Sequence, residues 1–245
     1  MGAPMTTDEI VKTIKHSSDL IILVEGIDDI RIYRWILESI GKEDCLVSTF
    51  GCNTLKDVFK RKNEFEDKNV VFITDRDILV YSDSIPSEYN GIVFTRGYSI
   101  ENDLYQGKKF YDDFFDEKDK ELFDKALDSF LLYYAKELDN LNENKIYNFR
   151  EKPEKILDKK DFELKKELYP DSPQPTDESL NHLKEKYDLL VRGHSLFKLI
   201  AMVLHRKNRD SKYSEVNIYE MCYKCYKSEC INDLKSRIEK AINNV

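Results

Sequence analysis

The chain has 245 residues, of which 41% are hydrophobic and 35% charged, and its formal net charge is −8. This composition excludes collagen-like, low-complexity and mostly disordered proteins, and the length can bury a core without disulfides or a structural metal. No apolar run approaches the roughly 18 residues that a membrane span needs, so we expect no membrane association. The five cysteines are scattered and odd in number, so we expect a reducing, cytoplasmic environment.

Charge is unevenly distributed along the chain. Residues 1–100 hold 12 basic against 17 acidic side chains, residues 101–190 hold 16 against 24, and residues 191–245 hold 11 against 6. The acidic total argues against a general nucleic-acid coat, whereas the basic last segment could meet a phosphate backbone locally. We expect such an uneven distribution of charge if acidic residues gather in a metal site and basic residues lie elsewhere.

The first hundred residues alternate between short apolar runs and amphipathic segments. The apolar runs predict strands at 19–25, near 45–49, at 70–74 and at 91–94. Helical spacing of apolar residues predicts helices at 28–40, where we expect Asp28 to act as a cap, and at 54–65. This order predicts an α/β fold with a parallel sheet, in which ligand sites lie at the carboxyl ends of the strands.

The character of the sequence changes after residue 105. Strand signals fade and aromatic residues recur at helical spacing, which predicts a helical insertion. The run YDLLV at 187–191 then predicts a further strand, followed by a helix to about residue 205 that Ser195 caps. We therefore divide the chain into the first part of the core (1–107), the helical insertion (108–186), and the end of the core with C-terminal helices (187–245).

Acidic residues follow the predicted strands. Glu25 and Asp29 surround the first strand–helix turn, Asp75 and Asp77 follow the strand at 70–74, and Glu101 follows the strand at 91–94. Gathered at one sheet edge, these carboxylates could not all stay ionised without a counter-charge. Mg²⁺ prefers such oxygen ligands, and two ions about 4 Å apart would clamp the attacking and leaving oxygens of a phosphodiester. Single acids after strands are also common as helix caps or solvated turn residues.

Two of these motifs resemble a known domain. Val24-Glu25-Gly26 with Asp29, followed by Thr74-Asp75-Arg76-Asp77, resembles the TOPRIM (topoisomerase–primase) domain. The segment YSIEN at 98–102 is similar to TOPRIM-like nucleases related to the OLD family, in the branch exemplified by AriB, the effector of PARIS anti-phage systems. The resemblance covers roughly residues 18–105 and, more weakly, 187–207.

The resemblance implies a TOPRIM-like, Rossmann-like parallel core and assigns roles to matching residues. Glu25, Asp75 and Asp77 match catalytic residues of the family, and the implied metal ligands are Glu25, Asp29, Asp75, Asp77 and Glu101. Relatives often carry a basic residue, commonly Lys after Gly, near the end of the core. Here the matching place holds Gly193-His194, with Lys198 one turn on, and a histidine there could stabilise the phosphorane or protonate a leaving oxygen.

The resemblance also implies an activity and partners. It implies an endonuclease that depends on Mg²⁺ or Mn²⁺, acts as a homodimer, and is held inactive by an AriA-like ABC-type ATPase until a phage protein is sensed. The PARIS effector implies RNA, tRNA in particular, as the substrate, and OLD relatives imply DNA. The residues do not separate these substrates. We expect phosphate contacts from basic side chains that flank the motifs: Arg76, Lys198, Arg206, Lys207 and Arg209.

Two other interpretations stay open. The departure at His194 and the low basicity of the chain are compatible with a non-catalytic TOPRIM-like regulatory or binding module. An Asp-based phosphatase is the third interpretation, because VVFITDRD at 70–77 resembles the start of haloacid-dehalogenase phosphatases, a hydrophobic strand followed by Asp-x-Asp. That interpretation does not explain Glu25-Gly26.

Overall fold

The computed structural model describes residues 5–27, 29–42, 46–49, 51–82, 84–105, 107–206, 209, 211–226 and 228–245. The chain divides into two compact units, the first formed by Met1–Asp103 with Glu229–Val245 and the second by Leu104–Ser228. Within the described ranges, no helix combines the length and apolar character that crossing a membrane requires. Asp28 and Lys207 lie outside the described residues, so the cap and the phosphate contact expected there are not described further.

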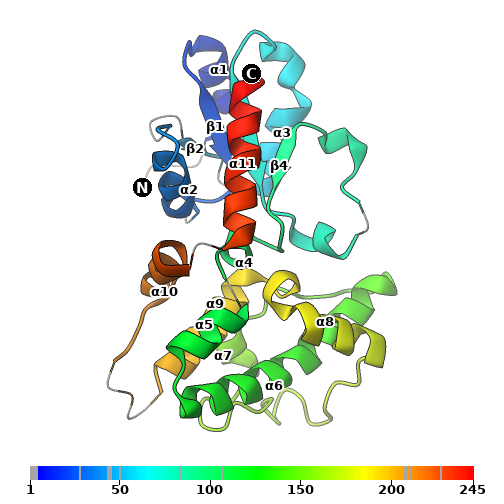
Figure 1. Cartoon of the computed structure of the whole chain (residues 1–245). Coiled ribbons are helices and arrows are strands. Elements are labelled where there is room, and N and C mark those ends of the chain that lie inside the picture. The colour runs from blue at the N-terminus through cyan, green and yellow to red at the C-terminus, as the bar shows by residue number, and fades with distance from the viewer. Residues whose placement is uncertain are drawn as a thin grey trace. The chain divides into compact units, whose positions relative to one another are not determined.

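The first unit is built on a parallel sheet (Figure 1). In the described part of the chain the sheet has four strands in the order β2-β1-β3-β4. Their bounds are Ile21–Val24 (β1), Leu46–Ser48 (β2), Val70–Thr74 (β3) and Ile92–Phe94 (β4). All neighbouring pairs are parallel, which confirms the α/β class predicted from the alternation of apolar runs and amphipathic segments.

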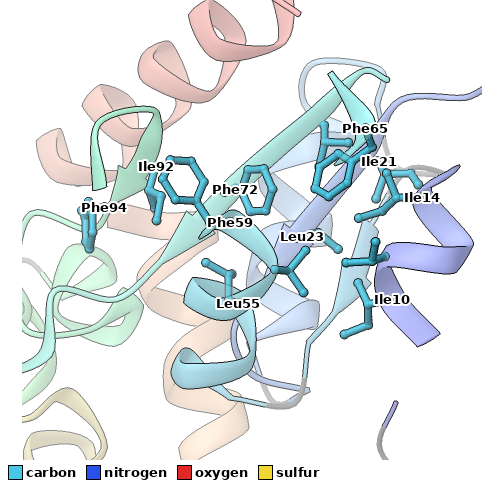
Figure 2. Packing of buried hydrophobic residues seen from close by; sticks show 13 residues of the cluster. Ile10, Ile14, Ile21, Leu23, Leu55, Phe59, Phe65, Phe72, Ile92 and Phe94 are labelled. Atoms are coloured by element: carbon cyan, nitrogen blue, oxygen red, sulfur yellow. The ribbon is translucent and has the colours of Figure 1, made fainter. Parts of the chain in front are cut away.

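Helices cover both faces of this sheet. The first unit holds α1 (Thr7–His16), α2 (Ile30–Glu38), α3 (Cys52–Lys60), a 3₁₀ turn (Lys62–Phe65), α4 (Ile100–Leu104) and α11 (Glu229–Asn243). Figure 2 shows α1 and α3 packing their apolar side chains against alternate strand residues such as Leu23 and Phe72. Because successive strand side chains point to opposite faces, Ile22 and Ile73 face the other layer, and both are completely buried.

The expected strand at 187–191 is wrong. Residues up to 190 form the end of α8 (Asp177–Leu190) in the second unit, and the chain returns to the first unit with α11 instead. α11 packs against β3 and β4, buries Leu234 and Ile238, and its Arg237 Nη1 donates a hydrogen bond to the Phe94 carbonyl at 2.6 Å. Of the segment 187–245, only 229–245 therefore belongs to the sheet unit.

The second unit is built from helices. They are α5 (Gly107–Phe114), α6 (Glu117–Asn142), α7 (Pro153–Ile156), α8, α9 (Gly193–Leu204), α10 (Glu215–Met221) and a π-helical turn (Cys222–Tyr226). Its bounds, 104 and 228, are wider than the predicted insertion at 108–186. Buried aromatic side chains of α6, including Phe123, Phe130 and Tyr134, fill its core. Ser195 lies inside α9, and Arg192, not Ser195, occupies the N-cap position.

Candidate active site at the carboxyl end of the sheet

Glu25 and Asp75 lie at the ends of neighbouring strands. The register of β1 and β3 pairs Val24 with Ile73, so both strands finish at the same edge of the sheet. Glu25 follows Val24, and its Oε2 accepts a hydrogen bond from Thr74 Oγ1 at 2.8 Å. The parallel topology thus brings together acids that are far apart in the sequence.

Asp75 is the centre of the acidic cluster. Its Oδ1 accepts a hydrogen bond from the backbone N–H of Ile100, the first residue of α4, at 2.9 Å. Burial raises the pKa of Asp75 well above its usual value, and four nearby carboxylates raise it further: Asp29, Glu25, Glu101 and Asp77. The structure therefore gathers all five acids that the sequence singled out around one buried carboxyl group.

The pKa of Glu25 is raised as well. Burial raises the pKa of the Glu25 carboxyl and the charge of Asp77 raises it further, while the Thr74 hydroxyl and the Lys56 ammonium oppose the shift. A carboxyl group that is buried away from water and lies beside another negative charge holds its proton more tightly. A cation bound at this edge would remove that penalty.

Three side chains of the described residues could share one metal ion. Glu25, Cys52 and Asp77 each offer a ligand atom, and these atoms lie within 4.8 Å of one another. Burial raises the pKa of the Cys52 thiol and the charge of Glu25 raises it further, so at neutral pH the thiol keeps its proton and is a weak ligand. The two carboxylates then dominate the donor set, which fits a hard cation such as Mg²⁺ or Mn²⁺. Asp29, Asp75 and Glu101 lie outside this group of three.

The Asp29 carboxylate lies where the first side-chain atom of a larger residue at position 26 would be. The Gly26 backbone N–H donates to Asp29 Oδ2 at 3.1 Å. A Cβ atom at position 26 would lie 2.4 Å from that same oxygen, closer than carbon and oxygen can approach. Asp29 occupies the N-cap position of α2, but its side chain makes no capping bond to the helix. The motif therefore holds the Asp29 carboxylate against the turn after β1.

The segment after β4 is fixed by acidic side chains. Asp103 is completely buried and accepts hydrogen bonds from the backbone N–H groups of Arg96 and Gly97 at 2.7 to 3.0 Å. Burial raises the pKa of Asp103 to about 6, against the effect of these bonds. Ser99 Oγ donates to Glu101 Oε2 at 2.5 Å. Asp103 therefore holds the loop that leads into α4, the helix that carries Glu101, and is not itself a member of the cation group.

Asp77 adopts an unusual backbone conformation. Its φ is 49°, in the left-handed region that aspartate tolerates better than most residues, and its N–H donates to the Tyr98 carbonyl at 2.8 Å. The bond ties the turn after β3 to the loop after β4. The arrangement keeps Asp77 beside Glu25 rather than extending the chain along the strand direction.

Sequence reasoning missed three residues of this site. Cys52 and Lys56 lie one turn apart on α3, and the charge of Lys56 lowers the pKa of Glu25. The Cys-x-x-x-Lys spacing at the start of a predicted helix was the available signal. Tyr33 of α2 is also present: its hydroxyl is buried, has no hydrogen-bond partner among the described residues, and lies near Asp75 and Asp29. Nothing in the spacing of Tyr33 distinguished it from a core residue.

The predicted basic residues His194 and Lys198 belong to the second unit. They lie on α9, which follows a helix and not the expected strand, so the reason for placing them at the sheet edge does not hold. Lys198 forms an ion pair with Glu215 of α10, and His194 Nδ1 lies 3.9 Å from the other oxygen of that carboxylate.

Of the remaining predicted phosphate contacts, Arg206 and Arg209 already form ion pairs. Arg206 Nε and Arg209 Nε donate to the two oxygens of Asp119, which is completely buried, at 2.8 and 3.0 Å. Arg206 also pairs with Asp116 at 2.6 Å. Arg76 of the first unit donates from Nη1 to the Arg96 carbonyl at 3.3 Å. Arg206 and Arg209 therefore anchor the start of α6 in the second unit.

The sequence matches no protein family and no curated protein.

Proposed function

We propose that the chain is a metal-dependent endonuclease of the TOPRIM type, which hydrolyses phosphodiester bonds in nucleic acid. The observation that carries the proposal is the convergence of Glu25 and Asp77, whose ligand atoms lie within 4.8 Å of each other at the carboxyl end of a parallel sheet, beside the buried Asp75. The order of the motifs along the strands also supports it, because the resemblance places a glutamate after the first strand and Asp-x-Asp after a later one.

Four residues of the site have a role in the proposed reaction. Glu25 and Asp77 would hold the cation, and a bound cation would neutralise charge on the phosphate and activate water. Glu25, which the resemblance matches to the metal-binding or acid/base glutamate of the family, lies beside Asp77, where it could accept a proton from the attacking water. The Lys56 ammonium, next to Glu25, supplies a positive charge for the phosphate oxygens. Asp75 positions the start of α4 through Ile100.

Substrate and partners follow from the resemblance alone. We propose tRNA as the substrate, an AriA-like ABC-type ATPase as the protein that restrains the activity, and a homodimer as the active form. DNA is the second substrate to test. Co-purification of the chain with such an ATPase, and release of cleavage activity when the two separate, would support this part of the proposal.

The activity is tested with purified protein, tRNA and plasmid DNA, each with Mg²⁺, Mn²⁺ or EDTA. We expect cleavage only with metal, and a loss of at least about a hundredfold in Glu25→Gln and Asp77→Asn. Matched controls are Glu66→Gln, an exposed acid, and Asp67→Asn, a surface acid paired with Lys68 at 3.5 Å; both belong to the same unit. Cleavage that survives in EDTA or in both site variants would contradict the proposal.

Two other results would point to the alternative functions. Metal binding without cleavage, measured after the chain is freed of any partner, would support a regulatory or binding module. Phosphate release from small phosphomonoesters, with a stable aspartyl-phosphate on Asp75, would support a phosphatase.

A further inference from the structure

The second unit contains a large cavity that the proposed nuclease site does not use. Its volume is about 1050 Å³. Side chains from α6, α7 with the loop after it, α9 and the start of α10 line it, and all of these elements belong to the second unit. Ligand pockets in proteins commonly enclose about 300–1,000 Å³, so this one is large enough for a nucleotide-sized molecule.

The wall of the cavity carries an excess of positive charge. Five cationic side chains line it, Lys118, Lys159, Lys160, Lys198 and Arg206, against the two carboxylates of Glu154 and Glu215, an excess of three. Three of these cations are already paired: Lys118 with Glu121, Lys198 with Glu215, and Arg206 with Asp116 and Asp119. Lys159 and Lys160 form no ion pair within the described part of the chain, and both are exposed. These two ammonium groups are therefore available to an anionic ligand.

The loop that carries these two lysines is held in shape. Leu157 and Leu164 form an antiparallel bridge across it, and the Lys160 N–H donates to Asp158 Oδ1 at 2.7 Å. Phe162 lies in the same loop with its ring buried. A loop fixed in this way presents its lysines at little cost in backbone entropy when a ligand binds.

One carboxylate oxygen of the wall has an unmet hydrogen-bonding requirement. Glu154 Oε2 is buried and has no hydrogen-bond partner among the described residues. A buried acceptor without a donor destabilises the fold, so a ligand hydroxyl or amine that donated a hydrogen bond to this oxygen would bind more tightly. Leu122, Phe162, Ala201 and Met202 form the apolar part of the wall, and His205 and Ser214 also line it.

These features together describe the ligand. The unpaired Lys159 and Lys160 would bind an anionic group of the ligand, and the Glu154 carboxylate would accept a hydrogen bond from it. The apolar side chains of the wall suit a flat ring. We propose that this cavity binds a nucleoside phosphate, with the phosphate at Lys159 and Lys160 and a ribose hydroxyl or base amine at Glu154. The ligand is either a free nucleotide or the terminal nucleotide of an RNA chain.

The test measures binding to the full chain by titration calorimetry in EDTA, so that the metal-dependent cluster of the first unit does not contribute. The probes are AMP, ATP, adenosine, inorganic phosphate and a 5′-phosphorylated RNA oligonucleotide. We expect saturable binding of AMP or ATP, at least about tenfold tighter than adenosine or phosphate alone, because each half of the ligand makes its own contacts. Failure of the nuclease assay leaves this result unaffected, so the two proposals fail separately.

Variants assign the binding to the cavity. Lys159→Ala with Lys160→Ala should weaken AMP binding about tenfold or more, whereas the control Lys152→Ala with Lys155→Ala, which removes two exposed lysines outside the cavity, should leave it unchanged. Glu154→Ala should weaken AMP and leave phosphate binding unaltered. A thermal melt of each variant confirms that it folds.

The outcomes separate the sources of the ligand and the ways in which the proposal fails. Tighter binding of the oligonucleotide than of AMP, with the same dependence on the two lysines, identifies an RNA end. Binding of AMP or ATP with exclusion of the oligonucleotide identifies a free nucleotide. The proposal is overturned if phosphate binds as tightly as AMP, if nothing saturates below about 1 mM, or if the lysine variant and its control bind equally.

Discussion

Asp75 is unusual among the acids of this chain because the fold opposes its negative charge. It has lost hydration through burial, it is near four other carboxylates, and the backbone N–H of Ile100 donates a hydrogen bond to it. A carboxyl group whose pKa is raised in the folded state destabilises that state whenever it must ionise. Such a group persists in a protein when its charge serves a bound cation or a reaction.

Replacing this charge should stabilise the protein while it removes function. In Asp75→Asn the amide oxygen can still accept from Ile100, and the charge is gone. We expect the free energy of unfolding at pH 7 to rise by about 1–2 kcal/mol in urea denaturation, with nuclease activity lost. The surface control Asp67→Asn should change it by less than about 0.5 kcal/mol. A less stable Asp75→Asn would mean that a group in the fold already compensates the carboxylate.

Tyr33 offers a second test at the residue scale. Its ring is buried, and its hydroxyl has no hydrogen-bond partner among the described residues. Tyr33→Phe keeps the ring and removes the unsatisfied group, so the free energy of unfolding should stay the same or rise by about 1 kcal/mol. Tyr33→Leu, which also leaves a void, should lower it by about 1–3 kcal/mol. A marked loss of stability in Tyr33→Phe would show that the hydroxyl has a partner in solution.

At the scale of elements, the last helix completes the sheet layer. α11 packs on β3 and β4 and buries three apolar side chains, Ile231, Leu234 and Ile238. Arg237 of the same helix donates to the carbonyl of Phe94 at the end of β4. β4, which precedes α4 and its Glu101, is therefore held in part by residues near the C-terminal end of the chain.

Leu234→Ala tests this role of α11. The side chain is completely buried, so its truncation should lower the free energy of unfolding by about 2–4 kcal/mol. Hydrogen exchange should show the loss of protection in β3 and β4, on which the helix packs. Glu239→Ala, an exposed position of the same helix, serves as the control and should be nearly neutral. Unchanged protection in the strands would contradict the packing described for α11.

The sequence predicted those elements whose signal is local. β1, β3 and β4 are apolar runs buried on both faces, and such runs stand out between polar turns. The run at 187–191 has the same appearance but ends a helix, because a short apolar run fits either a buried strand or a buried helical segment. The backbone at Lys186, with φ −135°, leaves helical geometry just before this run.

Only those residues of the candidate site that directly follow strands could be predicted from the sequence. Glu25, Asp75 and Asp77 follow strands, and parallel pairing brings strand ends together. Cys52 and Lys56 reach the site from α3. Tertiary packing sets the direction in which a helix crosses the edge of a sheet, and the spacing of residues in the sequence does not show that direction. The argument for placing His194 at the sheet edge depended on a strand at 187–191, and those residues end a helix instead.

At the scale of the whole molecule, the raised pKa values make stability depend on pH. Glu25, Asp75 and Asp103 all hold protons more tightly when folded, and the pKa of Asp103 is about 6. Between the ordinary carboxyl pKa near 4 and the folded value, the unfolded chain ionises first. These groups therefore lower the stability as pH rises through that window, with the contribution of Asp103 complete above about pH 6.

Metal should reverse this loss. A cation at a hundredfold excess over its dissociation constant adds about 2.7 kcal/mol to the folded state. We expect Mg²⁺ or Mn²⁺ to raise the melting temperature clearly at pH 8 and little at pH 5, where protons compete for the same carboxylates. Glu25→Gln with Asp77→Asn should abolish the shift, and Glu66→Gln should keep it. An equal shift at both pH values would place the metal elsewhere.

The return of the chain to the sheet through α11 has a consequence for synthesis on the ribosome. The strands that carry Glu25 and Asp75 emerge early, but α11, which packs against β3 and β4, emerges only after the whole of Leu104–Ser228 has been translated. A nascent chain would thus expose acidic loops without their finished support. The packing of the sheet unit is therefore completed only after the ribosome has translated the whole second unit.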